Sequence, residues 1–242
     1  DASPNPSTDL WIRVPRALRM VIYVALGVGV LSLSRVITGA GQLTAEGTFR
    51  SALQLSIPIA LAGLGGLWSE RAGVVNIGLE GMMVLGTWFG AYGGIAYGPW
   101  QGVLMGVAGG ALGGLLHAIA TVGFGVDHII SGVSINLLAV GLCEFLTSVS
   151  WDGASARESP AIPTNVAKVD LLPFLKEPLR TLADQNRFFL SDLANAILSV
   201  TTGISLLIVV ALTLFPLTYF VLWKPPFGLR LRSVGGDPDA AD

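Results

Sequence analysis

The chain has 242 residues, of which 52% are hydrophobic and 12% charged, and its formal net charge is -2. Soluble domains carry about 25% charged residues, so a water-soluble fold of this size would expose large apolar patches, which soluble monomers avoid. A chain without net basic charge also offers no surface suited to nucleic acid. We therefore expect an all-α, polytopic membrane protein that contacts lipid and binds no nucleic acid.

Apolar stretches along the chain predict about six membrane spans. A helix needs roughly 20 mainly apolar residues to cross the hydrocarbon core. The second stretch is the weakest because Pro58 interrupts it, and with the third it could form a broken pair instead of two clean rods. The six expected spans are residues 20–37, 52–68, 77–97, 102–124, 129–150 and 196–223.

Basic residues near the ends of the spans predict their orientation. Three arginines lie at 13–19, before the first span, and three basic residues lie at 224–232, after the sixth. Six spans return the chain to its starting side, so both ends are expected in the cytoplasm. The predicted segments are a cytoplasmic N-terminal segment (1–19), a transmembrane domain (20–223) with an outer loop at about 151–195, and a cytoplasmic segment (224–242).

The third span carries polar residues within a glycine-rich run. Asn76 and Glu80 are four residues apart, so they would share one face of a helix. Polar groups inside a span are costly and usually face the bundle interior or water. The pair could cap and staple a broken helix or contact a solute, and both interpretations stay open. Trp88 and Phe89 could stack on a ring of the solute, although Trp at span ends usually anchors the interface.

Glycines and a second pair of polar residues mark the fourth and fifth spans. A stripe of small residues lets membrane helices pack closely, so we expect helix packing rather than pore lining along the fourth span. In the fifth span, Asn136 could form interhelical hydrogen bonds or lie on a solute pathway. Glu144, two turns further on, could extend outward or line an outer vestibule. The glycines of the fourth span, four residues apart, are Gly102, Gly106, Gly110 and Gly114.

Several chemistries are not expected of this chain. Apart from Arg35 near a span end, no Lys or Arg lies in a predicted span, whereas a site for phosphates would normally present one. This favours a neutral polar solute. The sequence has no Gly-x-x-x-x-Gly-Lys-[Ser/Thr] loop for ATP hydrolysis. We expect no catalytic residue and no bound metal or cofactor, since His117 and His128 stand alone and Cys143 is the single cysteine.

Four stretches form an ordered set of motifs. They are residues 70–83 (Glu-Arg-Ala-Gly-Val-Val-Asn-Ile-Gly-Leu-Glu-Gly-Met-Met), residues 130–139 (Ile-Ser-Gly-Val-Ser-Ile-Asn-Leu-Leu-Ala), the outer loop with its Leu-Pro-Phe-Leu, and residues 227–242. Together they resemble the permeases of ABC importers for nucleosides, simple sugars and branched-chain amino acids. The first motif is most similar to the shorter of the two paired permeases in nucleoside importers.

This resemblance implies a fold like that of type II ABC importers in the bacterial plasma (inner) membrane. It also implies ABC ATPase subunits that use ATP and Mg, a second permease in a heterodimer or homodimer, and an extracytoplasmic substrate-binding protein. Family members usually continue with more spans, so we expect a bundle truncated at its C-terminal end. The last motif resembles the element that docks on the ATPase, which implies a coupling role for Arg230, Arg232, Gly235, Asp237, Pro238, Ala240 and Ala241.

The expected function is translocation of a small neutral polar solute, foremost a nucleoside, by a permease subunit that is not itself an enzyme. Simple-sugar and branched-chain amino acid permeases are alternatives within the family. An ion-coupled secondary transporter would need no ATP, and a structural scaffold would show no dependence on a solute. The candidate pathway residues are Asn76, Glu80, Trp88, Phe89, Asn136 and Glu144.

Overall fold

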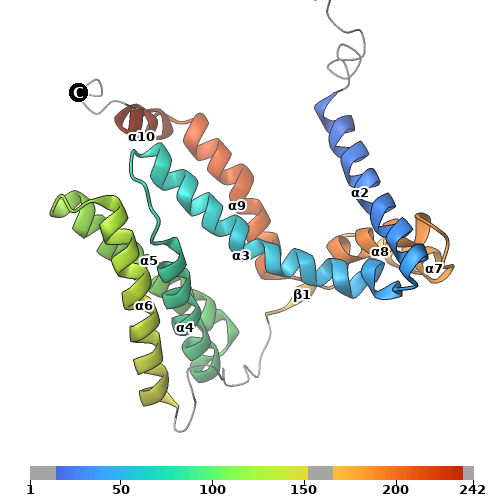
Figure 1. Cartoon of the computed structure of the whole chain (residues 1–242), viewed down its shortest axis with the longest axis horizontal. Coiled ribbons are helices and arrows are strands. Elements are labelled where there is room, and N and C mark those ends of the chain that lie inside the picture. The colour runs from blue at the N-terminus through green and yellow to red at the C-terminus, as the bar shows by residue number, and fades with distance from the viewer. Residues whose placement is uncertain (1–14, 152–165, 237–242) are drawn as a thin grey trace, which may run out of the picture. The chain divides into compact units, whose positions relative to one another are not determined.

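The computed structural model describes residues 15–151 and 166–236 (Figure 1). These residues are almost entirely helical, which confirms the expected all-α class. They divide into two compact units, one of them made of the chain up to Leu55 together with Lys168–Ile204. The other unit contains Ser56–Ala167 and the chain from Ser205 onward.

The first unit begins with α2 (Arg16–Thr38) and the 3-10 turn η1 (Gly41–Thr44). α2 ends because Gly39, at a φ of 70°, adopts the left-handed conformation that lets its amide donate to the Arg35 carbonyl. The remaining elements of this unit are the first part of α3 (Glu46–Arg71), β1 (Lys168–Val169), α7 (Pro173–Asp184) and α8 (Leu190–Thr201). β1 pairs with β2 (Ile204–Ser205).

The predicted sixth span, 196–223, is too long at its beginning. Its first residues belong to α8, and the spanning helix α9 begins only at Leu206 and ends at Trp223. The break arises because Gly203 adopts a positive φ of 59° and donates its amide to Asp170 Oδ1 at 2.7 Å. Ser205 then caps α9 by accepting a hydrogen bond from the Leu207 amide.

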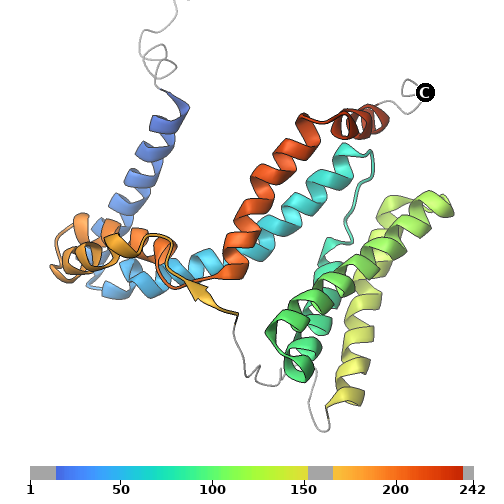
Figure 2. The ribbon, with the colours of Figure 1, turned by 180° about the vertical axis from the view of Figure 1, so that it is seen from behind.

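The second unit holds α4 (Leu79–Tyr97), α5 (Pro99–Ala118), the π-helical turn η2 (Ile119–Gly123) and α6 (His128–Ser150). It also holds α9, α10 (Pro226–Gly236) and the second part of α3. α3 continues through Pro58, so the expected interruption lies after the helix and not within it. α9 runs alongside the second part of α3 (Figures 1 and 2), and Trp68 Nε1 donates to Thr218 Oγ1 across them at 3.2 Å.

A glycine seam joins α4 to α5. A Cβ at Gly102 would lie 2.8 Å from the Gly94 Cα, and one at Gly106 would lie 3.1 Å from the Gly86 carbonyl oxygen. No side chain fits in these gaps, so the two backbones touch directly. Further along α5 the contact relaxes, because a Cβ at Gly110 would lie 3.5 Å from the Met82 carbonyl oxygen and one at Gly114 4.0 Å from the Met82 sulfur.

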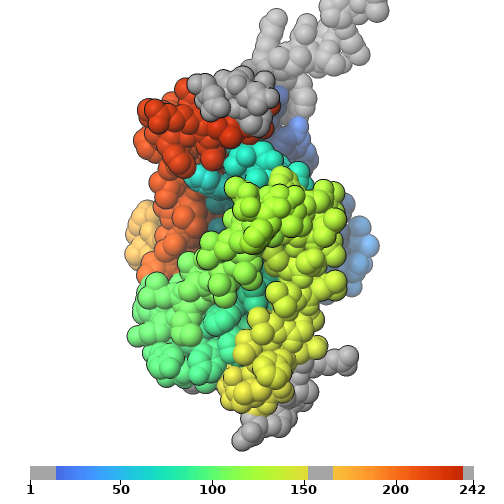
Figure 3. Space-filling model, turned by 90° about the vertical axis from the view of Figure 1, so that its left-hand side faces the viewer, coloured from blue at the N-terminus to red at the C-terminus, as the bar shows by residue number. Residues whose placement is uncertain are grey.

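Five helices of the described residues are long and apolar enough to cross a membrane: α2, α3, α5 with η2, α6 and α9. α4 is not among them, although its 19 residues are long enough. It packs against both α5 and α6, with Leu85 buried beside Ala139 and Cys143. A helix enclosed by protein in this way needs less apolar surface than one that faces lipid. Figure 3 shows the face of this unit on which α6 lies beside α4 and α5.

Candidate functional site

The first element of the candidate site is the break between α3 and α4. Residues 72–78 form no regular helix. Gly73, at a φ of 82°, turns the chain out of α3, and the Val74 amide donates to the Ser69 carbonyl oxygen at 2.9 Å. A left-handed glycine of this kind is a common way to end a helix and satisfy its last carbonyl groups. The positive φ by itself favours glycine at this position.

Asn76 fixes the path of the chain into α4. Its Oδ1 accepts a hydrogen bond from the Gly78 amide at 3.0 Å, which is the local turn that Asn commonly forms. The expected shared face of Asn76 and Glu80 does not form, because α4 begins at Leu79 and Asn76 precedes the helix. Glu80 lies in the first turn of α4 with an exposed side chain, where the helix dipole favours a carboxylate.

Asn136 ties α6 to this break. Its Oδ1 accepts from the Gly81 amide at 2.7 Å, and its Nδ2 donates to the Ile77 carbonyl oxygen at 3.1 Å. Two amides at the start of α4 are thereby satisfied by asparagine side chains, one by Asn76 and one by Asn136. α6 approaches closely enough for these bonds because a Cβ at Gly132 would lie only 2.8 Å from the Gly78 nitrogen.

An aromatic cluster surrounds Trp88 on α4. Its ring stacks on Tyr92 at 5.3 Å between centroids, meets Phe89 edge-on at 5.1 Å and lies 5.8 Å from Trp151. Trp88 Nε1 donates to Thr147 Oγ1 on α6 at 3.1 Å. Phe89 covers Gly109 of α5. These rings therefore join the helices to one another, and a solute ring would have to meet the half-buried edges of this cluster.

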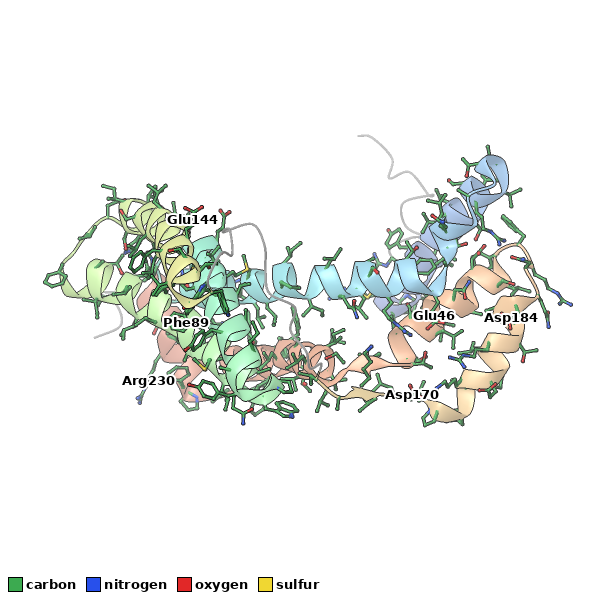
Figure 4. The ribbon with its side chains drawn as sticks, turned by 90° about the horizontal axis from the view of Figure 1, so that it is seen from below. Glu46, Phe89, Glu144, Asp170, Asp184 and Arg230 are labelled. Atoms are coloured by element: carbon green, nitrogen blue, oxygen red, sulfur yellow. The ribbon has the colours of Figure 1, made fainter. Side chains whose placement is uncertain are left out.

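Glu144 lies apart from these contacts. Its side chain is exposed on α6 (Figure 4). Asn136, two turns earlier on the same helix, is half-buried against α4. The two residues therefore have different surroundings, although they lie on one helix.

A pair of histidines near the same break was not expected to interact. His117 is buried at the end of α5, and its Nδ1 lies 2.9 Å from Ser131 Oγ on α6. The two histidine rings are 6.5 Å apart, and His128 Nδ1 accepts from the Val75 amide at 3.4 Å. The α5–α6 hairpin brings His117 close to Ser131 and His128. Among the described residues, no group of three His, Cys, Asp or Glu side chains could hold a metal ion.

Two arginines of the first unit hold its helices together. Arg35 on α2 forms an ion pair with the fully buried Asp192 of α8 at 3.3 Å and donates to Asn186 Oδ1 at 3.1 Å. Arg50 on α3 pairs with Glu46 and donates to the Thr202 carbonyl oxygen at 2.7 Å. Arg35 was predicted only as a basic residue near a span end, and no local sequence pattern indicates Asp192 as its partner.

The expected coupling residues lie partly on α10. A Cβ at Gly235 would lie 2.7 Å from the Gly73 nitrogen, so α10 touches the break between α3 and α4. Arg232 and Arg71 place their guanidinium groups over the Trp223 ring, at 5.5 and 5.6 Å from its centroid. Arg230 is exposed (Figure 4). Asp237, Pro238, Ala240 and Ala241 lie outside the described residues.

Residues 48–242 match the family model for the permease component of the branched-chain amino acid transport system. The chain belongs to this permease family. Over 201 residues the permease is 35% identical to a guanosine ABC transporter permease protein, NupQ, of Bacillus subtilis strain 168. The aligned region covers 78% of the chain and 56% of the relative.

Two further relatives are similar to this permease chain. One is a nucleoside ABC transporter permease protein, NupC, of Lactococcus lactis (36% identity, 77% of the chain, 55% of the relative). The other is a putative glucose ABC transporter permease protein, TsgC13, of Haloferax volcanii (32% identity, 82% of the chain, 54% of the relative). The permease chain thus spans about half the length of these curated relatives. No solved structure matches it.

Proposed function

We propose that this chain is part of the membrane-spanning subunit of an ATP-driven importer that carries a nucleoside into the cell. The observation that carries the proposal is its 35% and 36% identity to permeases named for guanosine and nucleosides. The presence of helices long and apolar enough to span a membrane supports a location in the membrane. The predicted spans contain no Lys or Arg apart from Arg35 near the end of the first, which suits an uncharged solute better than a phosphorylated one.

A simple sugar is the second candidate solute. It is favoured by the 32% identity to a permease named for glucose. Nucleosides and sugars are both neutral and rich in hydroxyl groups, so either could be bound by amides and aromatic edges without charged groups.

The proposed mechanism needs no covalent step in this chain. Solute enters from the outer face and crosses toward the cytoplasm along a pathway to which we assign Asn76, Glu80, Trp88, Phe89, Asn136 and Glu144. Partner ABC ATPases bind ATP with Mg, a second permease completes the pathway as a heterodimer or homodimer, and an extracytoplasmic binding protein delivers the solute. Alternating access then follows when ATP binding favours one of two packings of the helices.

The proposed orientation places both described ends in the cytoplasm of a bacterial cell. In that orientation the segment 1–19, the break at 72–78 and the segment 224–242 face the ATPases, while α7 lies in the outer loop. Single cysteines at exposed positions, Val75 for the cytoplasmic side and Phe174 for the outer side, test it with a membrane-impermeant thiol reagent. Labelling of Val75→Cys in intact cells would contradict the proposed orientation.

The function is tested by reconstituting the full-length permease with its ATPase and binding-protein partners in liposomes. We expect guanosine to stimulate ATP hydrolysis and to accumulate inside. Stimulation by glucose but not guanosine would establish the second candidate. Flux driven by an ion gradient and independent of ATP would contradict the importer assignment altogether.

A further inference from the structure

We propose that the turn at residues 71–73 is the point where α10 passes movement to the helix pair α4 and α6, with Gly235 and Trp223 as the positioning residues. This inference rests on the proposed function, because it takes α10 to be the helix that docks on the ATPase. It assigns a role to residues outside the expected solute pathway. The connection is made of three successive contacts within one compact unit.

The first contact is between two backbones. A Cβ at Gly235 would lie 2.7 Å from the Gly73 nitrogen and 2.9 Å from the Ala72 carbonyl carbon, and it would overlap the Arg71 carbonyl oxygen. A Cβ at Gly73 would lie 3.1 Å from the Gly235 Cα. Because main-chain atoms form this contact, no flexible side chain absorbs a displacement of α10. Any shift of Gly235 toward the turn must move the turn.

The second contact is an aromatic ring that two cations approach. Trp223, the last residue of α9, has the Arg71 guanidinium 5.6 Å and the Arg232 guanidinium 5.5 Å from its ring centroid. Both distances lie within the range for attraction between a cation and an indole face. The ring thus connects the end of α3 to α10 through groups that attract it from both helices.

The third contact carries the connection onward. Three residues after Gly73, Asn76 holds the Gly78 amide at 3.0 Å. Asn136 of α6 then holds both the Ile77 carbonyl oxygen at 3.1 Å and the Gly81 amide at 2.7 Å. The short segment 72–78 is thus fixed by α10 at one end and by α4 and α6 at the other. A segment tied at both ends transmits a displacement better than a free loop.

Neighbouring glycines at the end of α10 provide the decisive comparison. A Cβ at Gly235 would overlap the turn, whereas a Cβ at Gly236 would have nothing within 4 Å. Gly235→Ala and Gly236→Ala thus make the same chemical change on the same helix, one at the contact and one beside it. Both variants are made in the full-length permease and assembled with the partner ATPase and binding protein.

We expect both variants to retain the ATPase during purification. In Gly235→Ala, solute-stimulated ATP hydrolysis falls about tenfold, within the range typical of coupling between two sites, while Gly236→Ala resembles the wild type. Equal stimulation in the two variants would overturn the proposal. Loss of the ATPase from Gly235→Ala alone would also overturn it, because Gly235 would then act in docking.

A second measurement reads the turn directly. The Val75 side chain is exposed in the segment 72–78, so Val75→Cys reports the accessibility of this segment to a thiol reagent. A non-hydrolysable ATP analogue should change the labelling rate in Gly236→Ala and leave it unchanged in Gly235→Ala. An equal change in both would overturn the proposal even if hydrolysis differed.

Trp223 keeps the test independent of any misfolding caused by Gly235→Ala. Trp223→Phe retains an aromatic face and should keep most of the stimulation, whereas Trp223→Ala should lose it about as Gly235→Ala does. If Trp223→Ala showed the same stimulation of ATP hydrolysis as the wild type, the proposed role of the Trp223 ring would be wrong. If ATP hydrolysis by the wild-type complex responds to no nucleoside or sugar, the proposed function is wrong. If the wild type responds and the two glycine variants behave alike, only the proposed role of the turn is wrong.

Discussion

At the scale of single residues, Asn136 uses both ends of its amide group. It accepts from the Gly81 amide in the first turn of α4 and donates to the Ile77 carbonyl oxygen in the break before that helix. These bonds satisfy backbone groups that have no partner within the helix. A solute that binds here must use the remaining lone pairs of the side chain or replace one of these bonds.

Asn136→Ala should therefore destabilise the packing of α4 on α6. Hydrogen bonds between membrane helices contribute about 1–2 kcal/mol in model peptides, so we expect a loss of about that size. Denaturant titration of the full-length permease in detergent measures this loss in the free energy of unfolding. Ser134→Ala is the matched control, because Ser134 donates to the Ile130 carbonyl oxygen of its own helix. Equal stability of the two variants would contradict this role.

Asp170 makes the loop before α7 sensitive to acid. Hydrogen bonds from the Lys176 side chain and from the Gly203 amide lower the pKa of its carboxyl group. A carboxyl whose pKa is lowered by folding stabilises the fold above its ordinary pKa of about 3.9. That contribution disappears as the pH falls through the lowered value.

We expect Asp170→Asn to be less stable than the wild type at neutral pH and to approach it below pH of about 4. The measurement is the midpoint of thermal unfolding as a function of pH. Asp184→Asn removes an exposed carboxylate from α7 and serves as the control. A gap between wild type and Asp170→Asn that stays constant across this range would refute the assignment.

At the scale of elements, the glycine seam holds α4 against α5. Gly102→Ala would place a methyl group 2.8 Å from the Gly94 Cα, so the helices must separate. Overpacking of this kind costs about 1–3 kcal/mol, which denaturant titration of the purified permease would measure. Gly110→Ala, at ordinary contact distance from Met82, is the control and should cost less. If the two variants were equally stable, the backbone contact would not be needed.

The ion pair between α2 and α8 joins two elements that are distant in sequence. Asp192 is fully buried and the Arg35 side chain is 14% exposed. Removing one partner of such a pair leaves a buried charge, which typically costs about 3–5 kcal/mol. We expect this cost for Asp192→Leu in detergent unfolding, with a much smaller cost for the double variant Arg35→Met/Asp192→Leu. A double variant as unstable as the single one would show that packing and not charge connects the helices.

At the scale of the whole molecule, the sequence predicted the features that depend on local composition. Apolar length predicted the spans that became α2, α3, α5, α6 and α9, and the four-residue glycine spacing drew attention to the face of α5 that contacts α4. Gly73 and Asn76 lie within the motif that suggested the family. These signals are readable because each depends on residues close together in the chain.

Features that depend on distant segments could not be predicted in the same way. The partner of Arg35, the contact of His117 with Ser131, and the contact of Gly235 with Gly73 each require a particular arrangement of helices. The late start of α9 has the same origin, because Asp170 holds the Gly203 amide from another segment. Apolar composition alone predicts that the span begins at residue 196, because composition carries no information about the hydrogen bond between Gly203 and Asp170.

The order of synthesis gives the Arg35 ion pair one more consequence. α2 leaves the ribosome with its guanidinium, whereas Asn186 follows 151 positions later and Asp192 later still. A newly inserted first helix must therefore keep Arg35 among lipid headgroups by extending its aliphatic stem toward water. The guanidinium can leave the headgroups only after α8 has been synthesised and supplies Asp192. The packing of α2 in the first unit is therefore completed only after the last helix of that unit has formed.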